Sequence, residues 1–144
     1  MNNKSKELTA TVKLVNDRLH FEGAVEGNNP VSIDYIPPFG DNLGYTSLEL
    51  LLLSFSSCLG SAMLLFLRRM QKTFSEFEIN ATGERNEDHP TGFKRILIHI
   101  QMKSPDVTEA DLKKVVALAE EKYCPVWSMI KGNVNIVFEY SIKS

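Results

Sequence analysis

The sequence predicts an α+β fold with the element order βββαββαβ, and three features lead to that prediction. Two separate helical patterns lie between groups of strand patterns, and apolar residues occupy every second position in the last segment of the chain. The 144 residues, 43% of them hydrophobic, are enough for one domain with a buried core. We therefore expect a single domain over residues 1–144, with antiparallel sheets around a buried central helix.

The first third of the chain predicts an antiparallel meander. Runs rich in β-forming residues cover residues 8–15 and 18–25, and Asn16 and Asp17 separate them. A third run, residues 31–35, follows a turn containing glycine and proline. The prolines and glycines of residues 36–44 interrupt helices and strands alike, so they predict an ordered loop that leads into a helix.

A long helix is predicted to start at Thr46, because Thr46 and Glu49 have the spacing of a capping box. It can run to about Gln71, where Arg68, Arg69 and Lys72 favour its negative end.

Residues 50–67 of this helix carry no charge over 18 positions, which by length alone reaches the lower range of a transmembrane segment. Serines and Gly60 lower the hydrophobicity of its middle, and strand-rich sequence on both sides offers surfaces to cover it. We therefore favour a buried helix and expect no membrane partner. Because the helix is apolar around most of its circumference, a symmetric homodimer with this helix near the interface is predicted.

The second half predicts two strands, a helix and a final strand. The strands cover residues 77–83 and 93–103, and an amphipathic helix covers residues 108–122. Thr108 caps that helix, while Val107 and Leu112 form a hydrophobic staple. Pro125 limits its extent, and the alternation over residues 134–142 is the plainest strand signal in the chain.

Composition excludes several classes of function. The formal charge of −2, from interspersed acidic and basic residues, provides no basic stripe, so nucleic acid is not expected as a partner. Residues 1–7 lack the apolar region of a secretory signal, which favours a cytoplasmic location and transient disulfides. His20, His89 and His99 have no metal-binding spacing, and nucleotide and serine-hydrolase motifs are missing. We expect no metal and no cofactor.

The two cysteines lie in unlike surroundings. Cys58 is flanked in the helical run by serines and glycine, which leave room for a small molecule and supply hydroxyls near sulfur. Cys124 lies directly before Pro125, where the second predicted helix should end. This pairing suggests thiol chemistry. Trp127, Met129 and Ile130 could wall an apolar pocket near the second thiol, but core packing is favoured.

Four strings together carry a resemblance to a known family. They are residues 47–58 (SLELLLLSFSSC), residues 82–85 (TGER), residues 93–99 (FKRILIH) and residues 124–126 (CPV). In this order, over nearly the whole chain, they resemble the OsmC/Ohr family of thiol peroxidases. The resemblance implies an OsmC-like domain, an intertwined homodimer with active sites at the subunit interface, and reduction of organic hydroperoxides without metal or flavin. It also implies that Cys58 is the peroxidatic cysteine and Cys124 the resolving cysteine.

Family members also use an N-terminal arginine and a glutamate at the start of the helix. Arg18 is the candidate for the arginine, and the alternative is an ordinary surface arginine of a hairpin. Glu49 is the candidate glutamate, but in the best-studied subgroups the glutamate stands one residue earlier, where this chain has Leu48. Nine residues at about 100° each place Glu49 and Cys58 on opposite helix faces, and helix capping alone explains Glu49. This departure resembles the broader OsmC-like branch.

Two functions follow as hypotheses. The first is a thiol-dependent peroxidase, in which a Cys58 sulfenic acid is resolved by Cys124 and the disulfide is reduced by an external thiol. The second is a non-enzymatic dimeric protein whose cleft holds a small apolar ligand and whose cysteines are merely packed. We also expect the loop of residues 37–46 to lie beside the Cys58 end of the cleft, because it leads directly into the cysteine helix.

Overall fold

The computed structural model describes residue 4 and residues 6–144, and the chain forms two compact units, Met1–Leu50 and Leu51–Ser144. Two three-stranded sheets, one in each unit, and the helices between and after them confirm the α+β class. That residues 1–144 act as one domain stays a prediction.

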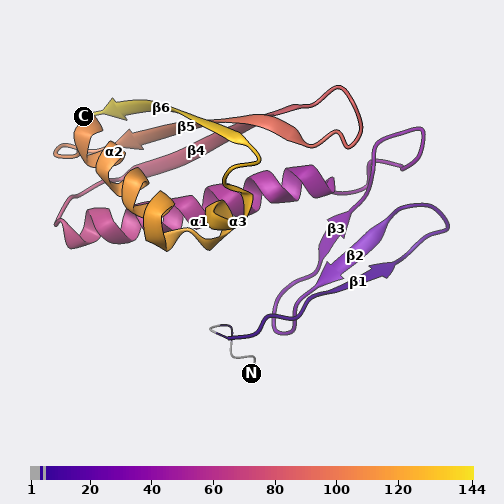
Figure 1. The fold of residues 1–144 in the computed structure, drawn as a ribbon. Helices are drawn as coiled ribbons and strands as arrows, with labels where there is room; N and C mark the ends of the chain where they lie inside the picture. Colours follow the sequence, from indigo (N-terminus) through magenta and orange to yellow (C-terminus); the bar gives the residue numbers. More distant parts are fainter. Residues whose placement is uncertain (1–3, 5) are drawn as a thin grey trace. The chain divides into compact units, whose positions relative to one another are not determined.

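The first unit contains the predicted meander. Strands β1 (Thr11–Leu14), β2 (Phe21–Ala24) and β3 (Val31–Ile33) form an antiparallel sheet in the order β1-β2-β3 (Figure 1). The strands are shorter than the predicted runs. The Asn16 side-chain oxygen accepts hydrogen bonds from the backbone N–H groups of Arg18 and His20, at 2.9 and 3.1 Å. The start of the predicted strand over residues 18–25 therefore belongs to the hairpin turn.

The proline- and glycine-rich segment is an ordered loop, as predicted, and a buried carboxylate organises it. Asp34 is 3% exposed and accepts the backbone N–H groups of Tyr35, Asp41 and Leu43. Burial alone would raise the pKa of Asp34, but these hydrogen bonds outweigh it and lower the pKa. A Cβ at Gly40 would lie 2.1 Å from the Tyr35 carbonyl oxygen, so only glycine fits there.

Helix α1 (Ser47–Arg69) begins and ends with defined caps. The backbone N–H of Thr46 donates to Glu49 Oε1 at 2.8 Å, and the N–H of Glu49 donates to Thr46 Oγ1 at 3.2 Å, which confirms the capping box. At the other end Gln71 adopts a left-handed φ of 59°, and the N–H of Lys72 donates to the Leu67 carbonyl in a Schellman motif.

The second sheet consists of β4 (Glu76–Arg85), β5 (Phe93–Lys103) and β6 (Asn135–Lys143) in the order β4-β5-β6. β4 and β5 are antiparallel, as predicted, but β6 lies parallel to β5, which differs from the predicted all-antiparallel sheets. The physical reason is the connection between β5 and β6. It crosses the sheet through α2 (Glu109–Leu118) and α3 (Pro125–Ile130), and such crossovers return the chain in the same direction.

Helices α1, α2 and α3 lie on one face of this sheet (Figure 1). Ile96, Ile98 and Ile100 alternate onto that face of β5 and are fully buried, as are Phe55 and Leu59 of α1. On α1, Gly60 permits a close approach to β4, since a Cβ there would lie 3.3 Å from the Phe77 ring and 3.4 Å from Ile79. The core of the second unit therefore lies between α1 and the sheet.

The other side of α1 is not covered by the rest of the second unit. Leu53 is 52% and Leu65 55% exposed, and both line a groove of about 660 Å³ between α1 and β4. The helix is long and apolar enough to cross a membrane, and a third of its most apolar stretch is buried inside the protein. The predicted burial of the helix is thus found on the side that faces the sheet, and its covering by a second copy stays a prediction.

The predicted helix over residues 108–122 is divided. Thr108 caps α2 in a capping box with Asp111, and the helix widens into a π-helical turn, η1 (Ala119–Tyr123), before Cys124. The Cys124 N–H donates to the Ala119 carbonyl at 2.9 Å, five residues back. Pro125 has no N–H with which to continue the helix, so α3 begins afresh after Cys124.

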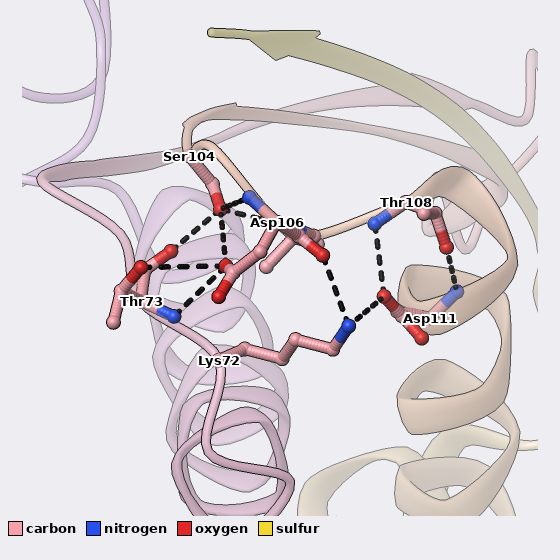
Figure 2. Close-up of polar contacts among 7 residues, drawn as sticks. Lys72, Thr73, Ser104, Asp106, Thr108 and Asp111 are labelled. Atoms are coloured by element: carbon pink, nitrogen blue, oxygen red, sulfur yellow. Dashed lines mark hydrogen bonds and ion pairs between the residues drawn. The ribbon is translucent and has the colours of Figure 1, made fainter.

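Polar contacts join the end of α1 to the start of α2 (Figure 2). Lys72 Nζ donates to the Asp106 carbonyl at 3.0 Å and forms an ion pair with Asp111 at 3.3 Å. The Asp106 carboxylate accepts the N–H of Thr73 at 3.0 Å, and the buried Ser104 hydroxyl donates to the Thr73 carbonyl. This junction fixes α2, and the turn that follows it, against the helix that carries Cys58.

Candidate functional site

The structure brings the two cysteines together. Cys58 lies in the middle of α1 and is half-buried, while Cys124 lies between η1 and α3 and is 2% exposed. Both are free thiols, and the Cys58 thiol is close enough to the Cys124 thiol to contribute to the raised pKa of Cys124. Residues 66 positions apart in the sequence therefore form one site, which is what a peroxidatic and resolving pair requires.

The surroundings of Cys124 keep its thiol protonated. Burial raises the pKa of Cys124 from 9.0 to about 11, and the neighbouring Cys58 adds to the rise. The backbone N–H groups of Trp127 and Val126, at the start of α3, act in the opposite direction. Because the thiolate is the nucleophile, Cys124 is a poor first nucleophile at neutral pH.

A small pocket of about 290 Å³ opens beside Cys58. The aromatic rings of Phe66 and Tyr123 form one wall, with their centroids 4.8 Å apart, and the Arg69 guanidinium lies 5.3 Å from the Phe66 ring centre. The complete lining is Cys58, Ser61, Ala62, Leu65, Phe66, Arg69 and Tyr123. A small, mainly apolar molecule can therefore reach the more exposed of the two thiols.

Trp127 lies behind Cys124 and belongs to the core. It is 4% exposed, and its ring contacts Phe55 of α1 and Phe138 of β6, both at centroid distances of 5.6 Å. This confirms the preferred interpretation of Trp127 as core packing. Met129 differs, since it is 73% exposed and packs in no core.

Arg18 is held by the loop of the first unit. Its guanidinium forms an ion pair with Asp41 and donates to the Pro38 carbonyl, and Asn16 also donates to the Asp41 carboxylate. Arg18 is thus an exposed side chain that contacts the loop of residues 37–46, and both interpretations of it stay open. The positions of Arg18 and of this loop relative to Cys58 stay predictions.

Glu49 is engaged as a helix cap. Its carboxylate accepts the backbone N–H of Thr46, which lowers the pKa of Glu49, and the Thr46 hydroxyl lowers it further. The residue is exposed and lies nine positions before Cys58 on α1. These contacts support the capping interpretation, and a catalytic role for Glu49 stays a prediction.

Sequence reasoning missed Arg69, Phe66 and Tyr123 as parts of the Cys58 pocket. The available signal was the spacing of residues 58, 62, 65 and 69, which places them along one helix face. Arg69 had a simpler explanation, as a cation near the helix end. Tyr123 could not be placed because the π-helical turn that orients it has no sequence signature.

Two of the three histidines, His20 and His99, are engaged in hydrogen bonds. His20 Nε2 contacts the Ser32 hydroxyl at 2.7 Å, and His99 Nε2 contacts the Ser141 hydroxyl at 2.9 Å. Among residue 4 and residues 6–144, no group of three or more histidine, cysteine or acidic side chains could hold a metal ion.

Comparisons with known proteins agree with this fold. The family described as OsmC-like protein matches residues 40–139. Protein YhfA of Escherichia coli K12 is 28% identical over 95 residues, which cover 66% of this chain and 71% of YhfA. A hypothetical protein from Aquifex aeolicus superposes with a TM-score of 0.82 and 25% identity, covering 96% of this chain and 97% of that one.

The organic hydroperoxide resistance protein OhrB of Bacillus subtilis superposes with a TM-score of 0.62 at 19% identity, covering 93% of this chain and 97% of OhrB. The likeness to OhrB shows a shared fold. Together with the family match over residues 40–139, these relatives confirm the resemblance: the chain belongs to the OsmC-like protein family.

Proposed function

We propose that this protein is a thiol-dependent peroxidase that reduces organic hydroperoxides. The observation that carries the proposal is the pair of adjacent free thiols, one beside a pocket and the other buried behind it with its pKa raised. Membership of a family whose structural neighbours include organic hydroperoxide resistance proteins supports a redox role.

In the first step the Cys58 thiolate attacks the terminal oxygen of the hydroperoxide. The O–O bond breaks, Cys58 becomes a sulfenic acid, and the alkoxide takes up a proton and leaves as an alcohol. Cys124 does not compete, because burial keeps its thiol protonated at neutral pH. Arg18 remains our candidate for the cation that favours the Cys58 thiolate.

In the second step Cys124 sulfur attacks Cys58 sulfur. The S–O bond breaks and the hydroxide leaves as water with the proton of Cys124, so a disulfide forms. The N–H groups of Val126 and Trp127 stabilise negative charge on Cys124 as that proton departs. An external thiol reductant then returns both cysteines to thiols by two exchange reactions.

The proposal extends to assembly and location. Exposed Leu53 and Leu65 on α1 support a homodimer in which a second copy covers this helix. We propose that residues 1–144 act as one OsmC-like domain in the cytoplasm, where thiol reductants can reduce the disulfide again.

Thiol counting tests the proposal. The reduced protein is treated with one equivalent of cumene hydroperoxide, and free thiols are titrated before mass spectrometry of its peptides. We expect the loss of two thiols and the appearance of a Cys58–Cys124 linked peptide. Retention of both thiols, with the hydroperoxide intact, would instead identify the non-enzymatic ligand-binding protein.

A further inference from the structure

Arg69 is the only charged side chain among the residues that line the Cys58 pocket, and the peroxidase cycle does not use it. Cys58 and Arg69 are eleven residues apart on α1. Three helical turns separate them, so they point within about 20° of the same direction and their Cα atoms lie about 16 Å apart along the axis. The thiol and the guanidinium therefore occupy opposite ends of one helix face.

The Arg69 side chain extends back toward Cys58. Its guanidinium lies 5.3 Å from the ring centre of Phe66, three residues nearer the cysteine, and Phe66 packs on Tyr123. Within the described part of the chain, Arg69 has no carboxylate within ion-pairing distance, whereas Lys72 pairs with Asp111 nearby. The pocket thus has a thiol at one end, aromatic walls between, and an unneutralised cation at the other end.

We propose that Arg69 selects hydroperoxides that also carry a carboxylate, binding that group while the –OOH group meets Cys58. This inference rests on the proposed peroxidase function. A guanidinium stays charged at any physiological pH, and its planar fork matches a carboxylate with two parallel hydrogen bonds. The aromatic wall accommodates the apolar chain between the two ends of the substrate.

Pocket size limits the length of that chain. The level of Phe66 lies eight residues from Cys58, about 12 Å along the helix axis. A carboxylic acid of about ten carbon atoms, with its hydroperoxide far from the carboxylate, spans that distance when its chain is extended.

The test compares a ten-carbon hydroperoxy carboxylic acid with its methyl ester. The readout is the ratio of kcat/KM for the acid to kcat/KM for the ester. Arg69 is exposed, so its charge should favour the acid by roughly threefold to tenfold, and the preference should weaken as salt is added. Arg69→Gln should remove the preference, and Arg69→Lys should keep part of it.

Arg68→Gln is the matched control. Arg68 is the neighbouring cation on α1, but its guanidinium lies 5.3 Å from the Phe74 ring centre, so the acid-to-ester ratio should stay at the wild-type value. A wild-type ratio near one, or a ratio that Arg69→Gln and Arg68→Gln lower equally, would overturn the role of Arg69 while leaving peroxidase activity intact.

A binding measurement separates this inference from the proposed function. If neither hydroperoxide is turned over, the peroxidase proposal fails. Titration of the reduced protein with the corresponding ten-carbon hydroxy acid and its methyl ester then decides the role of Arg69. Tighter binding of the acid, lost in Arg69→Gln, would support an anion-binding pocket, and equal binding of acid and ester would refute it.

Discussion

Cys58 and Cys124 differ in burial, and that difference supports the order in which we propose that the two thiols react. A half-buried thiol beside a pocket can meet a peroxide, whereas a thiol that is 2% exposed, with its pKa raised to about 11, is protected until its partner is oxidised. Arg69 adds charge at the far end of the same pocket. At the scale of single residues, the proposed site consists of a nucleophile (Cys58) and a cation (Arg69) on one helix, with a resolving thiol (Cys124) beside them.

The raised pKa of Cys124 predicts a loss of stability at alkaline pH. The folded protein holds the thiol proton more tightly than the unfolded chain, so its contribution is complete below about pH 9 and is lost as pH rises toward 11. The loss should be on the order of 2 kcal/mol. Urea unfolding at pH 8 and pH 11 measures it.

Cys124→Ala is the control for that measurement. Burial also raises the pKa of Tyr140, so both proteins should lose some stability over this range, but the variant should lose less. Equal losses in the two proteins would show that the Cys124 proton is not held by the fold.

At the scale of elements, the π-helical turn η1 determines where Cys124 points. It adds one residue to a helical turn, so every following side chain is rotated by about 100° relative to a continuous α-helix. The turn places Tyr123 in the wall of the Cys58 pocket and Cys124 behind it, next to the Cys58 thiol. The site thus depends on an irregular turn that lies beside it.

Deleting the exposed Glu121 from this turn should separate the cysteines without unfolding the protein. The deletion allows a continuous α-helix, which rotates Cys124 away from Cys58. After hydroperoxide treatment we expect no disulfide, and Cys58 oxidised to sulfinic acid. Mass spectrometry and circular dichroism measure the two effects. Glu121→Ala keeps the length of the turn and should form the disulfide, while disulfide formation at the wild-type rate in the deletion would contradict this role of η1.

The sequence predicts these elements well where the pattern is local. The capping box at Thr46 and the cap at Thr108 were readable because each depends on side chains only a few residues apart. The direction of β6 was not readable, since alternation is the same in parallel and antiparallel strands. The π-helical turn escaped prediction because the apolar spacing before it is that of an ordinary helix.

The same distinction applies to the site. Both cysteines could be predicted from their residue type and settings, and the structure brings them together. Arg69 could not be assigned to the Cys58 pocket from the sequence. Its proposed role depends on the contact of its guanidinium with the Phe66 ring, and on the packing of Tyr123 against Phe66 in the pocket wall. Such contacts between distant segments are not encoded in any short spacing.

At the scale of the whole molecule, the important feature of α1 is that it is apolar on two sides. One side of this helix covers the sheet of the second unit, and the other side exposes Leu53 and Leu65 beside an apolar groove. A helix that is apolar on both sides needs a second surface to cover it. Covering by a second copy would also shelter the substrate from water.

We therefore predict a homodimer at micromolar concentration, measured by sedimentation velocity. Leu53→Lys should shift the equilibrium toward monomer, because it places a charge on the uncovered face of α1. Met129→Lys, at an apolar residue of α3 that is 73% exposed, is the control and should remain dimeric. A monomeric wild-type protein, or its partition into membranes, would refute this assembly.

The rate of peroxide consumption by Cys58→Ser tests the central claim most directly. A serine hydroxyl is far less acidic and less nucleophilic than a thiol, so we predict that cumene hydroperoxide consumption falls to the uncatalysed rate. Cys124→Ser should still be oxidised once, and excess peroxide should convert its Cys58 sulfenic acid to sulfinic acid. Turnover by Cys58→Ser at the wild-type rate would contradict the assignment of this protein as a cysteine peroxidase.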